Sequence, residues 1–114
     1  MSDQIAQLER NISQAKELAD LGTSLERLRN NRDFKKLIMD HYLEKEAVRL
    51  VHLKADASMQ TPQHQQSILA QIDAIGIFTN YLNTVLAMAA RAKVDMADSE
   101  ETLAELRAEA LTDE

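Results

Sequence analysis

The three histidines are the residues whose chemistry depends most on spacing. His41 and His52 are separated by about 16 Å along a helix, so they cannot bind one metal ion within a chain. Metal-binding residues on one helix are three or four positions apart, and no two histidines here have that spacing. The Glu-x-x-His motif of di-iron helical bundles is also absent. We expect His41, His52 and His64 at the surface or in an interface, with no metal ion and no cofactor.

Carboxylate pairs are the second candidate for chemistry, for example Glu44 with Glu46 and Glu100 with Glu101. A catalytic pair needs a cleft that shifts its pKa values and fixes its separation. On amphipathic helices such residues are usually solvated, and Glu46 has Arg49 one turn away. The chain has no Ser/His/Asp order, no Gly-rich phosphate loop and no nucleotide-binding motif. We expect no catalytic residue and a protein that is not an enzyme.

Five cations gather in a short basic stretch: Arg27, Arg29, Arg32, Lys35 and Lys36. Residues 27–54 hold eight Lys or Arg against four Asp or Glu, a net charge of +4. Residues 98–114 hold seven carboxylates against one arginine, a net charge of −6. The basic stretch has three interpretations: it pairs with this acidic tail or another protein, it is a solvated face, or it binds nucleic acid. The overall charge of −6 and the few aromatic residues disfavour nucleic acid.

Composition indicates one helical domain. The chain has 114 residues, of which 45% are hydrophobic but only 4% aromatic. Two glycines and one proline leave an all-β fold without turn residues. Without cysteine there is no disulfide and no thiolate zinc site. The N-terminal residues lack the pattern of a signal peptide, and the apolar runs are shorter than the roughly 20 residues of a transmembrane helix, so we expect no membrane partner.

A long helical stripe dominates the second half of the chain. Its positions alternate in spacings of four and three: Ile68, Ile72, Ile75, Thr79, Leu82, Leu86, Ala89, Lys93 and Met96. This period predicts a helix over residues 62–97, capped by Thr61 and opened by Pro62. Such a helix is about 54 Å long, more than the width of a compact chain of this size. We therefore expect the stripe to be an oligomer seam, formed by Ile68, Ile72, Ile75, Leu82, Leu86 and Ala89. Lys93 either snorkels outward or marks the point where the seam has lost its partner.

Two further helices are expected before this stripe. The first extends from Ser2 or Asp3 to about residue 29, with a shift of its stripe after Ala15: the next apolar residues are Leu18, Leu21, Leu25 and Leu28. The second covers residues 34–55, with Asp33 as its N-cap. At α-helical spacing its apolar residues face two sides. One group is Phe34, Leu37, Ile38, Val48 and Val51, and the other is Met39, Leu43, Leu50 and Leu53.

The C-terminal region has a different composition from the preceding residues. Asp98 with Glu101 resembles a capping box, which predicts a short helix over residues 99–111. Its apolar residues Leu103, Leu106 and Ala110 are candidates for docking onto a partner. The sequence thus divides into a helical domain, residues 1–97, and an acidic tail or short docking helix, residues 98–114. We expect an all-α, elongated helical hairpin or three-helix bundle with a long C-terminal coiled-coil-like helix, in an oligomer.

Three segments resemble a family of small α-helical proteins from tailed bacteriophages: NRDFKKLI at 31–38, EAVRLVHLKAD at 46–56 and DAIG at 73–76. The resemblance covers most of residues 30–110 and implies no catalytic residue. It implies a virion structural or assembly protein: a head, neck or internal component, or a capsid-assembly scaffold. The expected partners are copies of the chain and another virion protein, in the virion or the host cytoplasm. The alternative is a small phage regulator that binds and inhibits a host protein.

Overall fold

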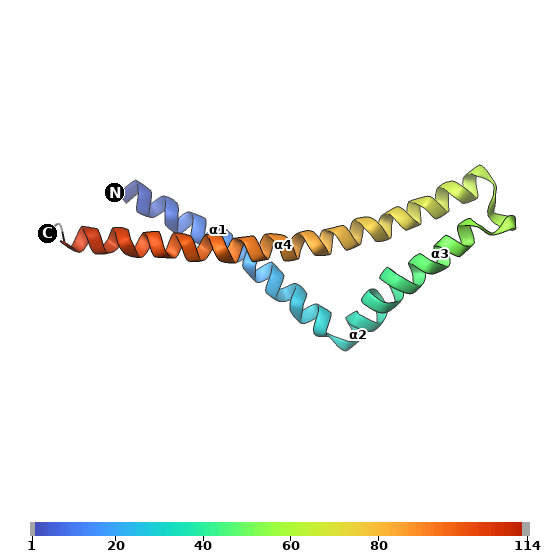
Figure 1. Ribbon diagram of the computed structural model, residues 1–114, viewed down its shortest axis with the longest axis horizontal. Coiled ribbons are helices and arrows are strands. Elements are labelled where there is room, and N and C mark those ends of the chain that lie inside the picture. Colours follow the sequence, from blue (N-terminus) through green and yellow to red (C-terminus); the bar gives the residue numbers. More distant parts are fainter. Residues whose placement is uncertain (1, 113–114) are drawn as a thin grey trace. The chain divides into compact units, whose positions relative to one another are not determined.

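The computed structural model describes residues 2–112, and in that range it contains helices and no strand (Figure 1). The expected all-α class is therefore confirmed. The elements in chain order are α1 (Ser2–Asn30), α2 (Arg32–Phe34), the π-helix η1 (Lys35–Glu46), α3 (Ala47–Lys54), the 3-10 helix η2 (Ala57–Met59) and α4 (Pro62–Thr112).

The chain forms two compact units. Unit 1 combines Met1–Leu25 with Val85–Glu114, and unit 2 comprises Glu26–Thr84. Helix α1 contributes to both units at its two ends, and so does α4. This division differs from the one expected at residue 97, because the acidic residues 98–112 belong to the same unit as the start of α1.

Unit 2 is built on a helical hairpin. Helices η1 and α3 pack along the first half of α4 (Figure 1). A short loop that contains η2 connects α3 to α4. The core residues are Leu50, Ile68 and Ile75, and Leu50 is only 1% exposed. Half-buried side chains surround them: Tyr42, Leu43, Ala47, Leu53, Met59 and Ile72. The ring of Tyr42 meets that of Phe78 edge-on, with 6.2 Å between centroids.

The π-helical winding of η1 decides which side chains reach this core. A π-helix has more residues per turn than an α-helix, so positions four or five apart share a face. Ile38 and Met39 are half-buried as a result, as are Tyr42 and Leu43 one turn later. The expected α-helix was wrong for residues 35–46, which wind as a π-helix. The two apolar groups of the α-helical projection hold in part: Met39, Leu43, Leu50 and Leu53 are all buried or half-buried, but Ile38 of the other group is half-buried too. Leu37, which that projection grouped with Ile38, is 64% exposed.

The helix starts in unit 2 depend on side-chain caps. Asn31 Oδ1 accepts hydrogen bonds from the backbone N–H groups of Asp33 and Phe34, each at 3.0 Å. The predicted cap, Asp33, was wrong: it lies within the first turn, where its charge suits the positive end of the helix. Thr61 caps α4 as predicted, since its Oγ1 accepts from the backbone N–H of His64 at 3.2 Å.

The loop between α3 and α4 is tied down by amide side chains. Gln65 Nε2 donates to the carbonyl oxygens of Lys54 and Met59 at 2.9 and 2.8 Å. Gln60 Nε2 donates to the Lys54 and Asp56 carbonyls at 3.0 and 2.7 Å. The last carbonyls of a helix have no partner within it, so these two amides satisfy groups that a sharp turn leaves free.

Unit 1 is an antiparallel pair of helices that approach closely through small residues. Ala15, Ala19 and Ala92 are buried, with Leu18 and Met96 packed beside them. Gly22 of α1 lies against Ala89 of α4. The expected stripe of Leu18, Leu21, Leu25 and Leu28 is confirmed in part: Leu18 and Leu25 pack inward, whereas Leu21 and Leu28 are 51% and 47% exposed. Ala19 and Gly22 are buried in their place. Small side chains form this contact because they let two helix backbones come together.

Helix α4 continues through Asp98 and Ser99 without interruption, so the expected separate helix over residues 99–111 was wrong. The stripe explains why: Met96 and Ser99 are half-buried, and Leu103 is buried one turn later. Thr102 Oγ1 donates to the Asp98 carbonyl oxygen at 3.0 Å, within the helix. The pattern of a capping box was present, but continued packing on one face kept the chain helical.

One property of α4 bears on membranes. It contains an 18-residue window with a mean hydropathy of 1.2, of which 11% is buried, and so meets a length-and-composition criterion for a membrane span. Residues 74–90 carry no Asp, Glu, Lys or Arg. Core helices of soluble proteins meet the same criterion, so this window is weak support for a membrane role.

Candidate interaction surfaces

The predicted seam on α4 is largely covered by the chain's own helices. Ile68 and Ile75 are buried with Leu50 of α3, and Ile72 is packed against that cluster. Ala89 is 4% exposed and faces Gly22 of α1. Leu82 and Leu86 are half-buried. Ile68, Ile72, Ile75 and Ala89 therefore pack within the protein, and Leu82 and Leu86 keep part of their surface exposed.

The stripe changes register after Ala89. Ala92 is 3% exposed, whereas Lys93 is exposed to solvent. Two successive spacings of three, Leu86 to Ala89 to Ala92, rotate the buried face so that the lysine lies outside it. The packed face then continues through Met96 to Leu103. Lys93 therefore does not belong to the packed face, and packing does not end at this residue.

A second stripe with the same spacing is exposed on the opposite side of α4. We call it the outer stripe and define it by Ala70, Ala74, Ile77 and Tyr81, four and three positions apart. Ile77 and Tyr81 are 69% and 60% exposed, and Ala70 and Ala74 are exposed too. A helix that is apolar on two opposite sides normally lies between two neighbours. Unit 2 supplies a neighbour on one side, so the outer stripe is the candidate contact surface.

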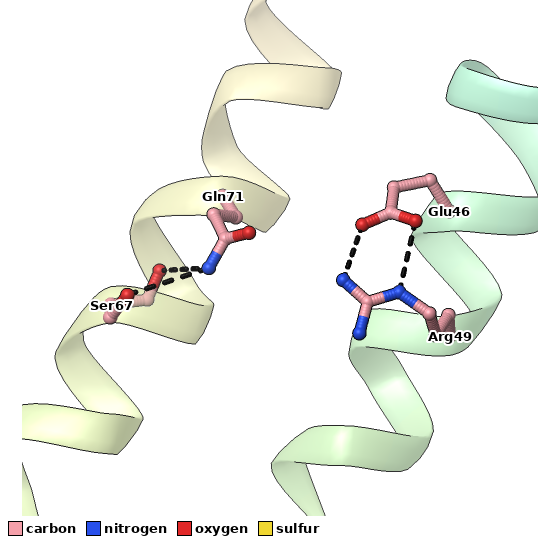
Figure 2. Close-up of polar contacts among 4 residues, drawn as sticks. All are labelled: Glu46, Arg49, Ser67 and Gln71. Atoms are coloured by element: carbon pink, nitrogen blue, oxygen red, sulfur yellow. Dashed lines mark hydrogen bonds and ion pairs between the residues drawn. The ribbon is translucent and has the colours of Figure 1, made fainter.

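Helix α3 also has an exposed apolar face, beside a surface ion pair. Val48 and Val51 are 56% and 58% exposed. Arg49 Nε donates to Glu46 Oε2 at 2.9 Å, and a second guanidinium nitrogen bonds the other carboxylate oxygen (Figure 2). The hydrogen bond from Arg49 lowers the pKa of Glu46, and the pKa of Arg49 is raised in return. An acid held in its charged form suits an ion pair better than proton donation.

Opposite this pair in Figure 2, the α4 surface is polar. Gln71 Nε2 donates to the Ser67 carbonyl oxygen at 3.3 Å and lies 3.4 Å from Ser67 Oγ. Both residues are exposed and flank Ala70 of the outer stripe: Gln71 follows it directly and Ser67 lies three positions before it. These bonds are local to one helix turn, and they form no site with Glu46 and Arg49.

The predicted docking residues of the C-terminal region share one face of α4 but differ in exposure. Leu103 is 7% exposed and Leu106 is half-buried, so both contribute to the packing of unit 1. Arg107 fixes this end of α4 to α1, through a bond of 2.9 Å from its Nη2 to Glu9 Oε1. Ala110 is exposed, and the neighbouring Leu111 is 75% exposed. Of the three predicted residues, Ala110 alone is freely available to a partner.

An open groove of about 690 Å³ lies along unit 1, between α1 and α4. Its floor includes Ala15, Leu18 and Ala92, and its rim includes the ion pair of Arg91 with Asp95, at 3.3 Å. The side chains here offer small apolar surface and solvated charges. The groove has the character of a packing surface for a helix.

The histidines and the paired carboxylates named in the sequence analysis are surface residues in the described part of the chain, except for the half-buried Glu46. His41, His52 and His64 are exposed, as the sequence led us to expect for surface or interface residues. Within residues 2–112 no three His, Asp or Glu side chains are placed to hold a metal ion. Glu100 and Glu101 are exposed as well.

No family model, curated protein or solved structure matches this chain.

Proposed function

We propose that this protein is a non-enzymatic structural or assembly protein that associates through exposed helix surfaces. The observation that carries the proposal is the outer stripe of α4. Ile77 and Tyr81 are more than half exposed, on a segment without charged residues between positions 74 and 90. Large exposed apolar patches mark interaction sites, because burying them removes apolar area from water.

The contact proposed here replaces the one expected from the sequence. Ile68, Ile72 and Ile75 pack against α3 within the chain, so self-association moves from that seam to the outer stripe. A heptad-like stripe of Ala70, Ala74, Ile77 and Tyr81 suits a helix of a second copy. The resemblance to small helical proteins of tailed bacteriophages supports a place in a virion or its assembly.

Substituting a charged residue into the outer stripe tests whether this surface forms the contact. Ile77→Asp puts an unpaired carboxylate into the proposed contact and should return an oligomer to the monomer mass, measured by light scattering. Asn83→Asp is the matched control, because Asn83 is exposed on the same helix and lies about 120° around it from Ile77. If Ile77→Asp keeps the mass of the natural protein, the outer stripe is not the contact.

Location distinguishes the structural proposal from the regulator alternative. A virion component co-purifies with particles in many copies, whereas an inhibitor of a host protein is made early in infection and is absent from them. Quantitative mass spectrometry of purified particles measures this directly. Absence from both mature particles and assembly intermediates would contradict the structural proposal.

A further inference from the structure

Positively charged side chains gather on the surface where α1 ends and α2 begins. We call it the basic corner and define it by Arg27, Arg29, Arg32, Lys35 and Lys36, all of which are exposed. The cap on Asn31 fixes the turn between the two helices. Leu28 and Leu37 in the same segment are 47% and 64% exposed. The corner therefore presents both positive charge and apolar surface.

Two of the five cations line a groove beside the corner, and one carboxylate, Asp33, lies within the corner's own segment. A groove of about 450 Å³ on one side of the corner is lined by Arg29 and Lys35, but also by Glu26, Asp40 and Glu44. Arg27, Arg32 and Lys36 are not part of that lining. Among residues 2–112, none of the five cations takes part in an ion pair. Like charges so close together repel one another, and an anionic partner would relieve this repulsion.

The end of α4 has the opposite character. Residues 98–112 hold five carboxylates: Asp98, Glu100, Glu101, Glu105 and Glu109. The single cation there, Arg107, is already bonded to Glu9 of α1. In the described residues none of these five carboxylates forms an ion pair. Leu111, which is 75% exposed, is the most exposed large apolar side chain within residues 3–112.

We propose that the acidic end of α4 from a second copy docks on the basic corner. Five cations would meet five carboxylates, and Leu111 would meet the exposed Leu28 and Leu37. Electrostatic complementarity of this kind speeds encounter and selects the partner, and the apolar contact contributes affinity. The contact joins two different surfaces, so it is heterologous and propagates into a ring or a filament. This inference rests on the proposed self-association and adds to it a second, salt-sensitive contact.

Charge reversal tests the contact on both surfaces. Arg32→Glu with Lys36→Glu reverses the corner, and Glu101→Lys with Glu105→Lys reverses the helix end. All four residues are exposed, so folding is preserved. Each double variant should lower the weight-average mass about twofold or more, because like charges then face each other. The natural protein should dissociate in the same way between about 0.01 M and about 1 M salt, as the screening length falls from about 30 Å to about 3 Å.

Mixing the two double variants shows whether the contact is between molecules. The reversed corner of one variant then meets the reversed helix end of the other, and the mass should recover. The matched controls are Lys16→Glu with Lys93→Glu and Glu17→Lys with Asp20→Lys. These residues are exposed and lie outside both surfaces, so the mass should not change.

Three outcomes would overturn the inference. If the oligomer keeps its mass in both double variants and at high salt, it uses another contact. This inference then fails, and the proposed self-association stands. A natural protein that is monomeric at every salt concentration removes the proposed function as well. An increase in mass that requires added duplex DNA would assign the corner to nucleic acid instead of a second copy.

Discussion

Gly22 of α1 lies so close to Ala89 of α4 that a Cβ atom on the glycine would overlap the Cβ of the alanine. Neither atom can rotate away, because each Cβ is fixed by its own backbone. The missing side chain thus sets how closely the two helices of unit 1 approach. Glycine is unfavourable inside a helix by roughly 0.5–1 kcal/mol, and the close contact compensates for that loss.

Gly22→Ala should destabilise the protein although alanine favours helix. The propensity gain of about 1 kcal/mol is smaller than the roughly 1–3 kcal/mol expected from overpacking. Gly76→Ala is the matched control, since nothing lies within 4 Å of a Cβ built there. It should stabilise by about 0.5–1 kcal/mol. Thermal and urea denaturation of both variants measure the difference.

Ala89→Gly should rescue Gly22→Ala, since it removes the overlapping atom from the other side. Equal melting temperatures for Gly22→Ala and Gly76→Ala would contradict the close approach of α1 and α4.

Leu50→Ala should cost about 2–5 kcal/mol of unfolding free energy, as a cavity opens in unit 2. Leu50 is 1% exposed and packs against Ile68 and Ile75. Val48→Ala, two positions away on the same helix, should change stability by less than about 0.5 kcal/mol because its side chain is 56% exposed. Urea titrations that give equal losses for the two variants would place the core of α3 on the wrong face.

Much of this fold follows from local sequence signals. The break near Asn31, the loop before Thr61 and Pro62, and the long helix after them were all predicted from caps and spacing. A continuous or kinked first helix to about residue 29 was predicted, and α1 extends from Ser2 to Asn30. These features depend on a few neighbouring residues, so a single sequence is enough to identify them.

The helix faces were harder to predict, for two physical reasons. A projection at α-helical rotation misplaces residues 35–46, where the chain winds as a π-helix and Ile38 and Leu43 share a face. Small residues such as Ala19 and Ala92 also carry little hydrophobic signal, although they are buried where two helices approach. The outer stripe was visible in the spacing of Ile77 and Tyr81, but a stripe alone does not show which side its own chain covers.

Asn31→Ala should lower the unfolding free energy by about 0.5–2 kcal/mol, because α2 then loses an acceptor for two backbone N–H groups. Asn30→Ala tests the neighbouring position, where no side-chain cap is formed, and should be close to neutral. Circular dichroism through a urea titration compares the two. A larger loss from Asp33→Ala than from Asn31→Ala would restore Asp33 as the cap.

Acid should weaken the loop before α4. Hydrogen bonds from the Ser58 hydroxyl and backbone N–H lower the pKa of Asp56 in the folded protein. The unfolded chain therefore binds this proton more readily, so the contribution is present above the ordinary carboxyl pKa and is lost as the pH falls. Asp56→Asn keeps an acceptor oxygen without the charge. Its stability should depend less on pH in the acidic range, as measured by urea titration at several pH values, and an unchanged dependence would contradict this account.

The solution mass of the full-length chain, measured by light scattering over a tenfold range of concentration, tests self-association most directly. One chain weighs 12.9 kDa. The exposed outer stripe, with Ile77 and Tyr81, predicts a mass several times that value. A mass of 12.9 kDa at every concentration would contradict assembly through this surface.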